Sequence, residues 1–234
     1  MDQQQQDQVQ YTTFEKLLDQ EIQKNDLSDW KQQFLFIDSL RAQSKFHSDQ
    51  FKIQEWWDQL QPLTDSIRSN VSKNALMLIK EAIQHNNVYD EKILHKVFEK
   101  CESDFKFLKN EALQTVEILS LKPYSDDLIQ ILCNITLQSN YKLQSHSYPT
   151  LVKIVLASDY NCDWDNIIKA TLAVYIGKSV ECKKASDQLY LALQKQKPEV
   201  LEKEEQLKVI GDRTKQKGLQ KGFKEFLQCQ KKQS

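Results

Sequence analysis

Helical stretches along this chain break five times into a short polar turn, and an apolar residue then begins the next helix. These restart residues are Trp30, Val71, Leu108, Leu143 and Val180, at intervals of 41, 37, 35 and 37 residues. Two of them open similar strings, Val71-Ser72-Lys73-Asn74-Ala75 and Leu108-Lys109-Asn110-Glu111-Ala112. A period of about 35–47 residues with two helices per unit is typical of a solenoid, in which helix pairs stack in sequence order.

The expected fold is therefore all-α, a HEAT- or armadillo-type solenoid of about six antiparallel helix pairs. Four Gly and four Pro among 234 residues leave few of the tight turns that an all-β fold needs. Leu, Lys, Gln and Glu dominate instead, and all four are good helix formers. A solenoid displays its turns in a row along one edge, and such an edge usually binds another macromolecule.

Apolar spacing predicts where the helices lie. After a first pair that ends near Lys45, we expect helices at 49–67 and 70–84, 90–101 and 105–120, 125–137 and 143–157, and 163–176 and 178–195. A polar arm at 1–10, a helical body at 11–195 and a basic extension at 196–234 divide the chain. Because the extension has few apolar residues and three glycines, we expect it to be less stable than the body.

Two details of packing follow from the pattern. Val71, Leu108 and Leu143 should pack inward, each at the start of the second helix of its pair. Trp56 and Trp57 are adjacent and so diverge by 100° on a helix, which means that one ring packs between helices while the other lies near the surface.

Charge is unevenly distributed, although the net charge is only −1. Residues 1–194 carry 21 basic and 27 acidic side chains, whereas residues 195–234 carry 11 basic and 6 acidic ones. A basic end on a mildly acidic body assists contact with an acidic partner, but the bias is too weak to indicate nucleic acid. Mean hydropathy is −0.63 and no apolar run approaches the roughly 18 residues needed to span a bilayer, so we expect no membrane partner.

The residue types that carry chemistry do not form a recognisable site. Five widely spread cysteines contain no C-x-x-C pair, and the four histidines have no metal-ligand spacing, so neither a metal nor a cofactor is expected. Gly177-Lys178-Ser179 resembles the end of a phosphate-binding loop, but Leu172 stands where that motif needs glycine. We therefore expect a protein that is not an enzyme.

The turns are more informative, because each presents one or two cations and the first also presents a large aromatic. They hold Trp30-Lys31, 68–73, 104–109, 139–142 and 178–184. A basic residue in the first turn of a helix opposes the helix dipole slightly. For any single turn, a solvated lysine or a core tryptophan is the ordinary interpretation, but the repetition favours a binding edge.

Three strings resemble a known family. Asp29-Trp30-Lys31, followed by Phe36-Ile37-Asp38-Ser39-Leu40-Arg41, resembles the opening of a TOG domain, a HEAT-repeat tubulin-binding domain. The string at 67–75 is similar to the second-repeat signature of the CLASP and crescerin subgroup, Leu-Arg-Ser-x-Val-Ser-Arg-x-Ala. The string at 100–112 is similar to that subgroup's third-repeat turn. The resemblance is specific over 14–120 and weaker, but in register, to about 195.

The resemblance implies six HEAT repeats in a flat paddle whose turns contact tubulin. It implies that Trp30 is the aromatic that rests on tubulin, with Lys31 beside it. It also implies that cations of each later turn contact tubulin. The implied tubulin-binding residues are Trp30, Lys31, Arg68, Lys73, Lys106, Lys109, Lys142, Lys183 and Lys184. This chain departs from the family in the fourth turn, where Lys142, Gln144 and His146 stand in place of a basic pair. Lysine also replaces arginine at several positions, which loses bidentate geometry.

Two functions stay open at this point. The first is a non-enzymatic protein whose single TOG-like domain decorates or stabilises microtubules, which places it in the cytoplasm on the cytoskeleton. The crescerin-like signature extends that location to the cilium and axoneme, with other ciliary proteins as further partners. The second is a HEAT-repeat adaptor within a larger assembly, whose turns contact something other than tubulin. The sequence does not separate soluble tubulin from the microtubule lattice as the partner.

Overall fold

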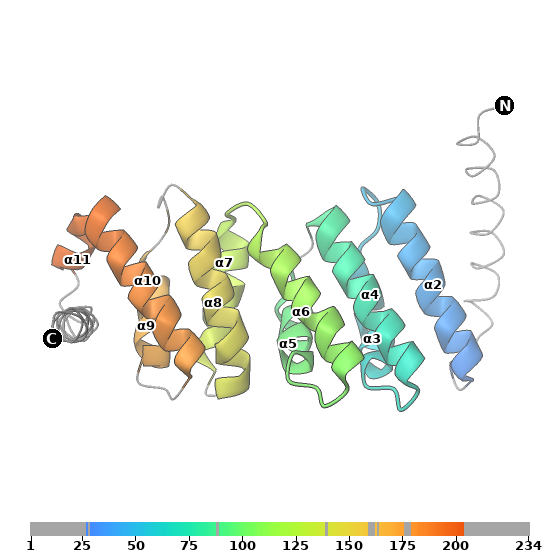
Figure 1. Ribbon diagram of the computed structural model, residues 1–234. Helices are drawn as coiled ribbons and strands as arrows, with labels where there is room; N and C mark the ends of the chain where they lie inside the picture. Colours follow the sequence, from blue (N-terminus) through green and yellow to red (C-terminus); the bar gives the residue numbers. More distant parts are fainter. Residues whose placement is uncertain are drawn as a thin grey trace, which may run out of the picture. The chain divides into compact units, whose positions relative to one another are not determined.

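The computed structural model describes Leu27, Cys162 and residues 29–87, 89–138, 140–158, 164–175 and 179–203. These residues form ten α-helices and one 3-10 turn and contain no strand, which confirms the predicted all-α class (Figure 1). The chain divides into two compact units, Met1–Leu119 (unit 1) and Ser120–Ser234 (unit 2). None of the helices described is long and apolar enough to cross a membrane.

Unit 1 arranges its described helices in two layers. It contains α2 (Trp30–Phe46), η1 (Ile53–Trp56), α3 (Trp57–Thr64), α4 (Ser69–Asn86), α5 (Glu91–Lys100) and α6 (Lys106–Ser120), whose last residue crosses the unit boundary. In one layer α4 packs against α2 and is joined to α6 by ion pairs. In the other layer the C-terminal end of α3 is joined to α5, while α3 also packs on α4 across the layers. The helices thus follow one another as in an α-solenoid.

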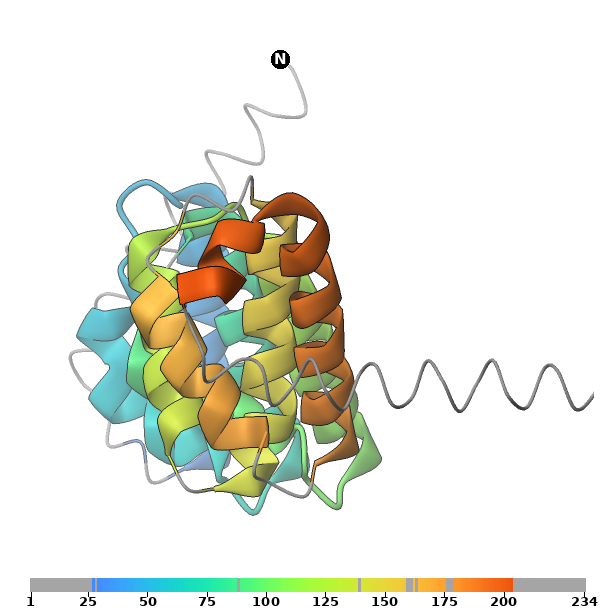
Figure 2. The same cartoon turned by 90° about the vertical axis from the view of Figure 1, so that its left-hand side faces the viewer.

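Unit 2 repeats this arrangement. Its helices are α7 (Asp126–Leu137), α8 (Tyr141–Ala157), α9 (Trp164–Tyr175), α10 (Val180–Gln196) and α11 (Pro198–Lys203). Within the unit α7 packs on α9 and α8 packs on α10, while α7 also packs on α8. Figure 2 shows α9 and α10 side by side in different layers. The sequence predicts a last helix pair in the extension, at about 199–210 and 219–230, and α11 covers the start of its first helix. The rest of that pair lies outside the described residues, as does the arm at 1–10.

The core confirms the predicted packing details. Val71, Leu108 and Leu143 are all buried near the start of α4, α6 and α8. Trp57 is buried, whereas Trp56 is half-buried and meets the ring of Phe36 edge-on at a centroid distance of 5.9 Å. The helix expected at 49–67 is shorter than predicted: a 3-10 turn precedes α3, which contains Pro62 and ends two residues later. Proline supplies no N–H for a helical hydrogen bond, which is consistent with this short helix.

A polar network links α2 to α4. Arg41 donates to Glu81 through Nε and Nη2, at 2.9 and 2.6 Å, and to Asn74 Oδ1 through Nη1 at 2.7 Å. Asn74 in turn donates to Asp38 at 2.8 Å. Hydrogen bonding to Glu81 outweighs the cost of burial and raises the pKa of Arg41 above its already high ordinary value. The bidentate geometry fixes how α2 and α4 are aligned along their axes.

A second polar cluster links the end of α3 to α5. Asp65 accepts from Lys96 at 2.9 Å and pairs with Lys100 at 2.7 Å, and Lys96 also pairs with Glu99. Partial burial by itself would raise the pKa of Asp65. The hydrogen bonds from Lys100 and Lys96 outweigh burial and lower that pKa below its ordinary value. The charged form of Asp65 is therefore the one that stabilises the fold.

Substituting Arg41 should destabilise unit 1. Arg41→Ala leaves the Glu81 carboxylate without its bidentate donor, and we expect a loss of about 1.5–3 kcal/mol in the free energy of unfolding, measured by urea titration at 222 nm. The control is Lys52→Ala, because the Lys52–Glu55 pair spans 3.8 Å between exposed side chains and exposed pairs contribute little. Equal stability of the two variants would contradict a structural role for the network.

Protonation of Asp65 at low pH should break its ion pairs with Lys96 and Lys100. Since the folded-state pKa of Asp65 is lowered, its stabilisation is present above the ordinary carboxyl pKa and is lost as the pH falls below about 4. We expect Asp65→Asn to be less stable than the wild type at pH 7, with the difference shrinking between about pH 4 and pH 2. The measurement is the melting temperature at each pH, and a constant difference across this range would contradict the assignment.

Candidate binding edge

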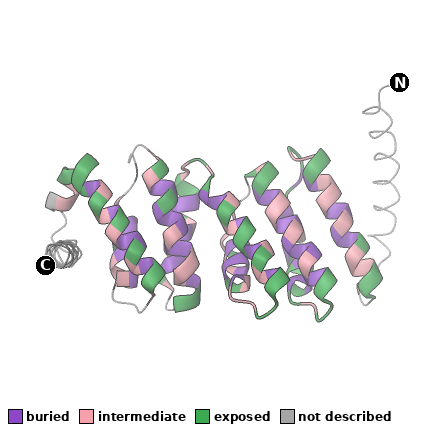
Figure 3. Ribbon diagram, in the orientation of Figure 1, coloured by how far each residue is buried: buried purple, intermediate pink, exposed green. Residues whose placement is uncertain are grey.

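The turns that precede α2, α4 and α6 lie at the same end of unit 1. They form its lower border in Figure 1, because these three helices run in the same direction within one layer. We call the residues of these turns, at 29–31, 65–69 and 101–107, the unit-1 edge. In Figure 3 the turns before α4 and α6 are coloured as exposed over much of their length, including 67–69 and 104–107. The edge contains Trp30, Lys31, Arg68 and Lys106 of the predicted contact residues.

The first turn presents Trp30 to solvent. Asp29 caps α2, its carboxylate accepting from the backbone N–H of Lys31 at 3.3 Å, so the helix begins directly at the tryptophan. Trp30 is 43% exposed and is not a core residue. The Lys31 ammonium lies 5.9 Å from the centroid of the Trp30 ring, within range of a weak cation–π contact.

In the second turn the side chain of Arg68 is exposed, whereas that of Lys73 forms an ion pair. Arg68 occupies the N-cap position of α4 with its side chain exposed. Lys73 lies one turn further along the helix, where its ammonium is 3.8 Å from Glu111 of α6. Glu111 also binds Lys80 at 2.6 Å, so Lys73 is the outer member of a three-residue ion-pair group. Reversing the charge of Lys73 would therefore disturb the packing of α4 on α6 as well as the surface.

The third turn combines an exposed cation with two aromatics. Lys106 is the first residue of α6 and is exposed, whereas Lys109 is half-buried. The rings of Phe105 and Phe107 contact each other with centroids 5.9 Å apart, and Phe105 is nevertheless 61% exposed. This turn offers an aromatic surface beside its cation.

Unit 2 carries the predicted residues of the last two turns on α8 and α10. Lys142 and Lys184 are exposed, and Lys183 is half-buried. Gln144, which stands where the family has a basic residue, donates its side-chain amide to the carbonyl oxygens of Thr136 and Gln138 at 3.0 Å each. Its amide is therefore used within the unit. Lys178, also predicted in this turn, lies outside the described residues.

The sequence pattern did not identify the large exposed side chains that directly precede a cation in these turns, which we call the tips of the turns. Ile67 is 97% exposed, directly before Arg68, and Phe105 and Tyr141 are exposed directly before Lys106 and Lys142. With Trp30-Lys31, four successive turns each carry an exposed large side chain followed by a cation. The spacing of 37, 38 and 36 residues was visible in the sequence, but exposure of these side chains was not.

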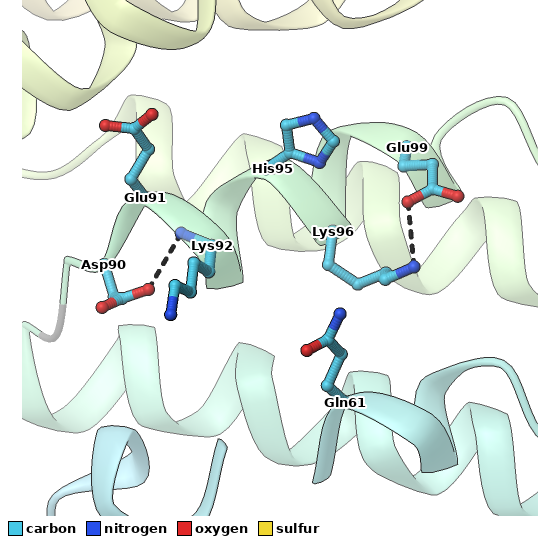
Figure 4. Close-up of a pocket in the computed structure, with 7 residues that line it drawn as sticks. All are labelled: Gln61, Asp90, Glu91, Lys92, His95, Lys96 and Glu99. Atoms are coloured by element: carbon cyan, nitrogen blue, oxygen red, sulfur yellow. Dashed lines mark hydrogen bonds and ion pairs between the residues drawn. The ribbon is translucent and has the colours of Figure 1, made fainter. Parts of the chain in front are cut away.

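Other chemistry-bearing groups lie away from these turns. A shallow groove of about 650 Å³ is lined by one residue of α3 and by residues of α5 and its N-cap: Gln61, Asp90, Glu91, Lys92, His95, Lys96 and Glu99 (Figure 4). None of the nine predicted contact residues is among them. The part of the chain that is described contains no group of three or more His, Cys, Asp or Glu side chains able to hold a metal ion. Burial raises the pKa of the Cys101 thiol to about 12, so this cysteine is not a reactive thiolate at neutral pH.

No family model matches this chain, and no curated protein matches it.

Proposed function

We propose that this protein binds tubulin or the microtubule lattice without catalysing a reaction, as a single TOG-like domain of HEAT repeats. One observation carries the proposal: three successive turns at one end of unit 1 expose Trp30, Arg68 and Lys106. These turns contain the residues that the CLASP and crescerin resemblance assigns to tubulin contact. The two-layer packing of helices in each unit and the repeat period support HEAT repeats as the underlying arrangement.

The expected energetics favour a contact spread over several residues. Each exposed cation contributes about 0.2–1 kcal/mol when paired at a surface, which alone gives weak binding. An interface tryptophan often costs about 2 kcal/mol or more when truncated. Trp30 therefore dominates the contact in this proposal, and the exposed cations of the same edge orient the partner. The cytoskeleton is the corresponding location, with the axoneme as its ciliary form.

The first experiment is co-sedimentation with taxol-stabilised microtubules, with gel filtration against soluble tubulin beside it. We expect the wild type to pellet with microtubules and Trp30→Ala to lose about tenfold or more in affinity. Since Trp30 is exposed, its replacement should leave the helical content and the melting temperature nearly unchanged. Loss of the fold in Trp30→Ala would show that the ring supports the core instead.

Charge reversal tests the cations separately. Lys31→Glu, Arg68→Glu and Lys106→Glu together should weaken binding, because all three are exposed at the unit-1 edge. Lys73 is left unchanged in this variant because of its pair with Glu111. The matched control reverses Lys45, Lys52 and Lys92, which are also exposed in unit 1 but lie off the edge. If the wild type does not bind tubulin in either form, the adaptor function takes the place of this proposal.

A further inference from the structure

Three large apolar side chains project from the unit-1 edge. Trp30, Ile67 and Phe105 each stand at a turn tip, and each is followed by an exposed cation, Lys31, Arg68 or Lys106. Phe107 extends the third tip through its contact with Phe105. An apolar side chain left almost wholly in water, as Ile67 is, gains free energy when a partner covers it, in proportion to the area removed from water.

The charges of this edge nearly cancel. Asp29, Asp65, Glu102 and Asp104 lie in the same turns as the three exposed cations. Over its described residues, unit 1 carries 12 basic and 14 acidic side chains. Long-range attraction to an acidic partner is therefore weak, and exposed pairs are screened further by salt. The cations can still select orientation, because each lies immediately beside an apolar tip.

We infer that the unit-1 edge docks by inserting the three apolar tips into recesses of a folded protein surface, with carboxylates beside each recess. This inference rests on the proposed function and assigns Ile67 and Phe105, together with Trp30, as the residues that determine affinity. Neighbouring packed helices lie about 8–10 Å apart, so the tips of α2, α4 and α6 require recesses at about that spacing. Lys31, Arg68 and Lys106 pair with the carboxylates and fix the direction in which the edge lies.

A protein partner fits this edge better than an anionic membrane. Recognition of anionic lipid typically requires clusters of about four to eight basic residues, and here three exposed cations share the edge with four acids. Recesses of a folded surface, in contrast, accept single side chains at fixed spacing, and the tips occur once per turn. Binding to an anionic membrane is one of the outcomes that the test below distinguishes.

The test compares two double substitutions in the full chain. Ile67→Ser with Phe105→Ser removes two tips, and Leu35→Ser with Phe46→Ser removes two exposed apolar side chains of α2 that lie off the edge. Phe46 is a close chemical match for a tip, because Lys45 lies 5.2 Å from its ring centroid. Co-sedimentation with microtubules at about 50, 150 and 300 mM salt gives the affinities, and melting temperatures check folding. Ile67→Ser alone is the reserve variant, because this almost fully exposed side chain supports no core.

We expect the edge variant to lose about tenfold or more in affinity at every salt concentration, the single variant to lose less, and the control to bind like the wild type. Wild-type affinity should change less than about threefold across the salt range. Wild-type-like binding by the edge variant, with loss only on charge reversal, would overturn the inference and leave the proposed function standing. No wild-type binding to microtubules overturns both. Binding to phosphatidylserine vesicles that needs Ile67 and Phe105 would overturn the protein partner in favour of a membrane.

Discussion

A helix such as α4 has to bury its apolar side chains against more than one neighbouring helix, and the rest of the structure depends on this constraint. An isolated amphipathic helix of this length is marginal in water, and most helical stability comes from burying its apolar face. The buried residues of α4 extend from Val71 to Ile83, and α4 packs on α2 within its layer and on α3 across the layers. Because α2, α4 and α6 run in the same direction within one layer, the turns that precede them gather at one end of unit 1 (Figure 1).

Polar contacts then fix the alignment that apolar burial leaves free. An apolar stripe tolerates sliding along a helix axis, whereas the bidentate pair of Arg41 with Glu81 has one good geometry. In unit 2 a buried hydroxyl group does the same: Tyr148 of α8 donates to Thr171 of α9 and accepts from Ser186 of α10. Burial raises the pKa of Tyr148 well above its ordinary range, so this hydroxyl keeps its proton and three helices meet at a neutral hydrogen-bonded point.

Local pattern was enough to predict most of the helices but not which side chains of the edge are exposed. Val71, Leu108 and Leu143 are buried as expected, because apolar spacing and polar turns act over a few residues. The pairing of Lys73 with Glu111 joins residues 38 positions apart, and no local pattern indicates it. Gln144 likewise appears in the sequence as a weakened contact residue, yet its amide caps carbonyl groups of the preceding turn. The exposure of Ile67 was not predicted, because an apolar side chain is ordinarily expected to be buried.

Position within the helix explains which predicted cations remain available to a partner. Lys31, Arg68, Lys106 and Lys142 stand at the cap or in the first two residues of their helices and are exposed, whereas Lys73, Lys109 and Lys183 stand at the fourth or fifth residue and are half-buried. Lys184 is the exception, being fifth in α10 and exposed. A cation at the start of a helix opposes the helix dipole, and exposure of an apolar side chain to water is unfavourable. Both features are unfavourable in the free protein, and a partner that covers the apolar side chains and pairs with the cations would offset them. Their coincidence in three turns of unit 1 is therefore the basis of the proposed binding edge.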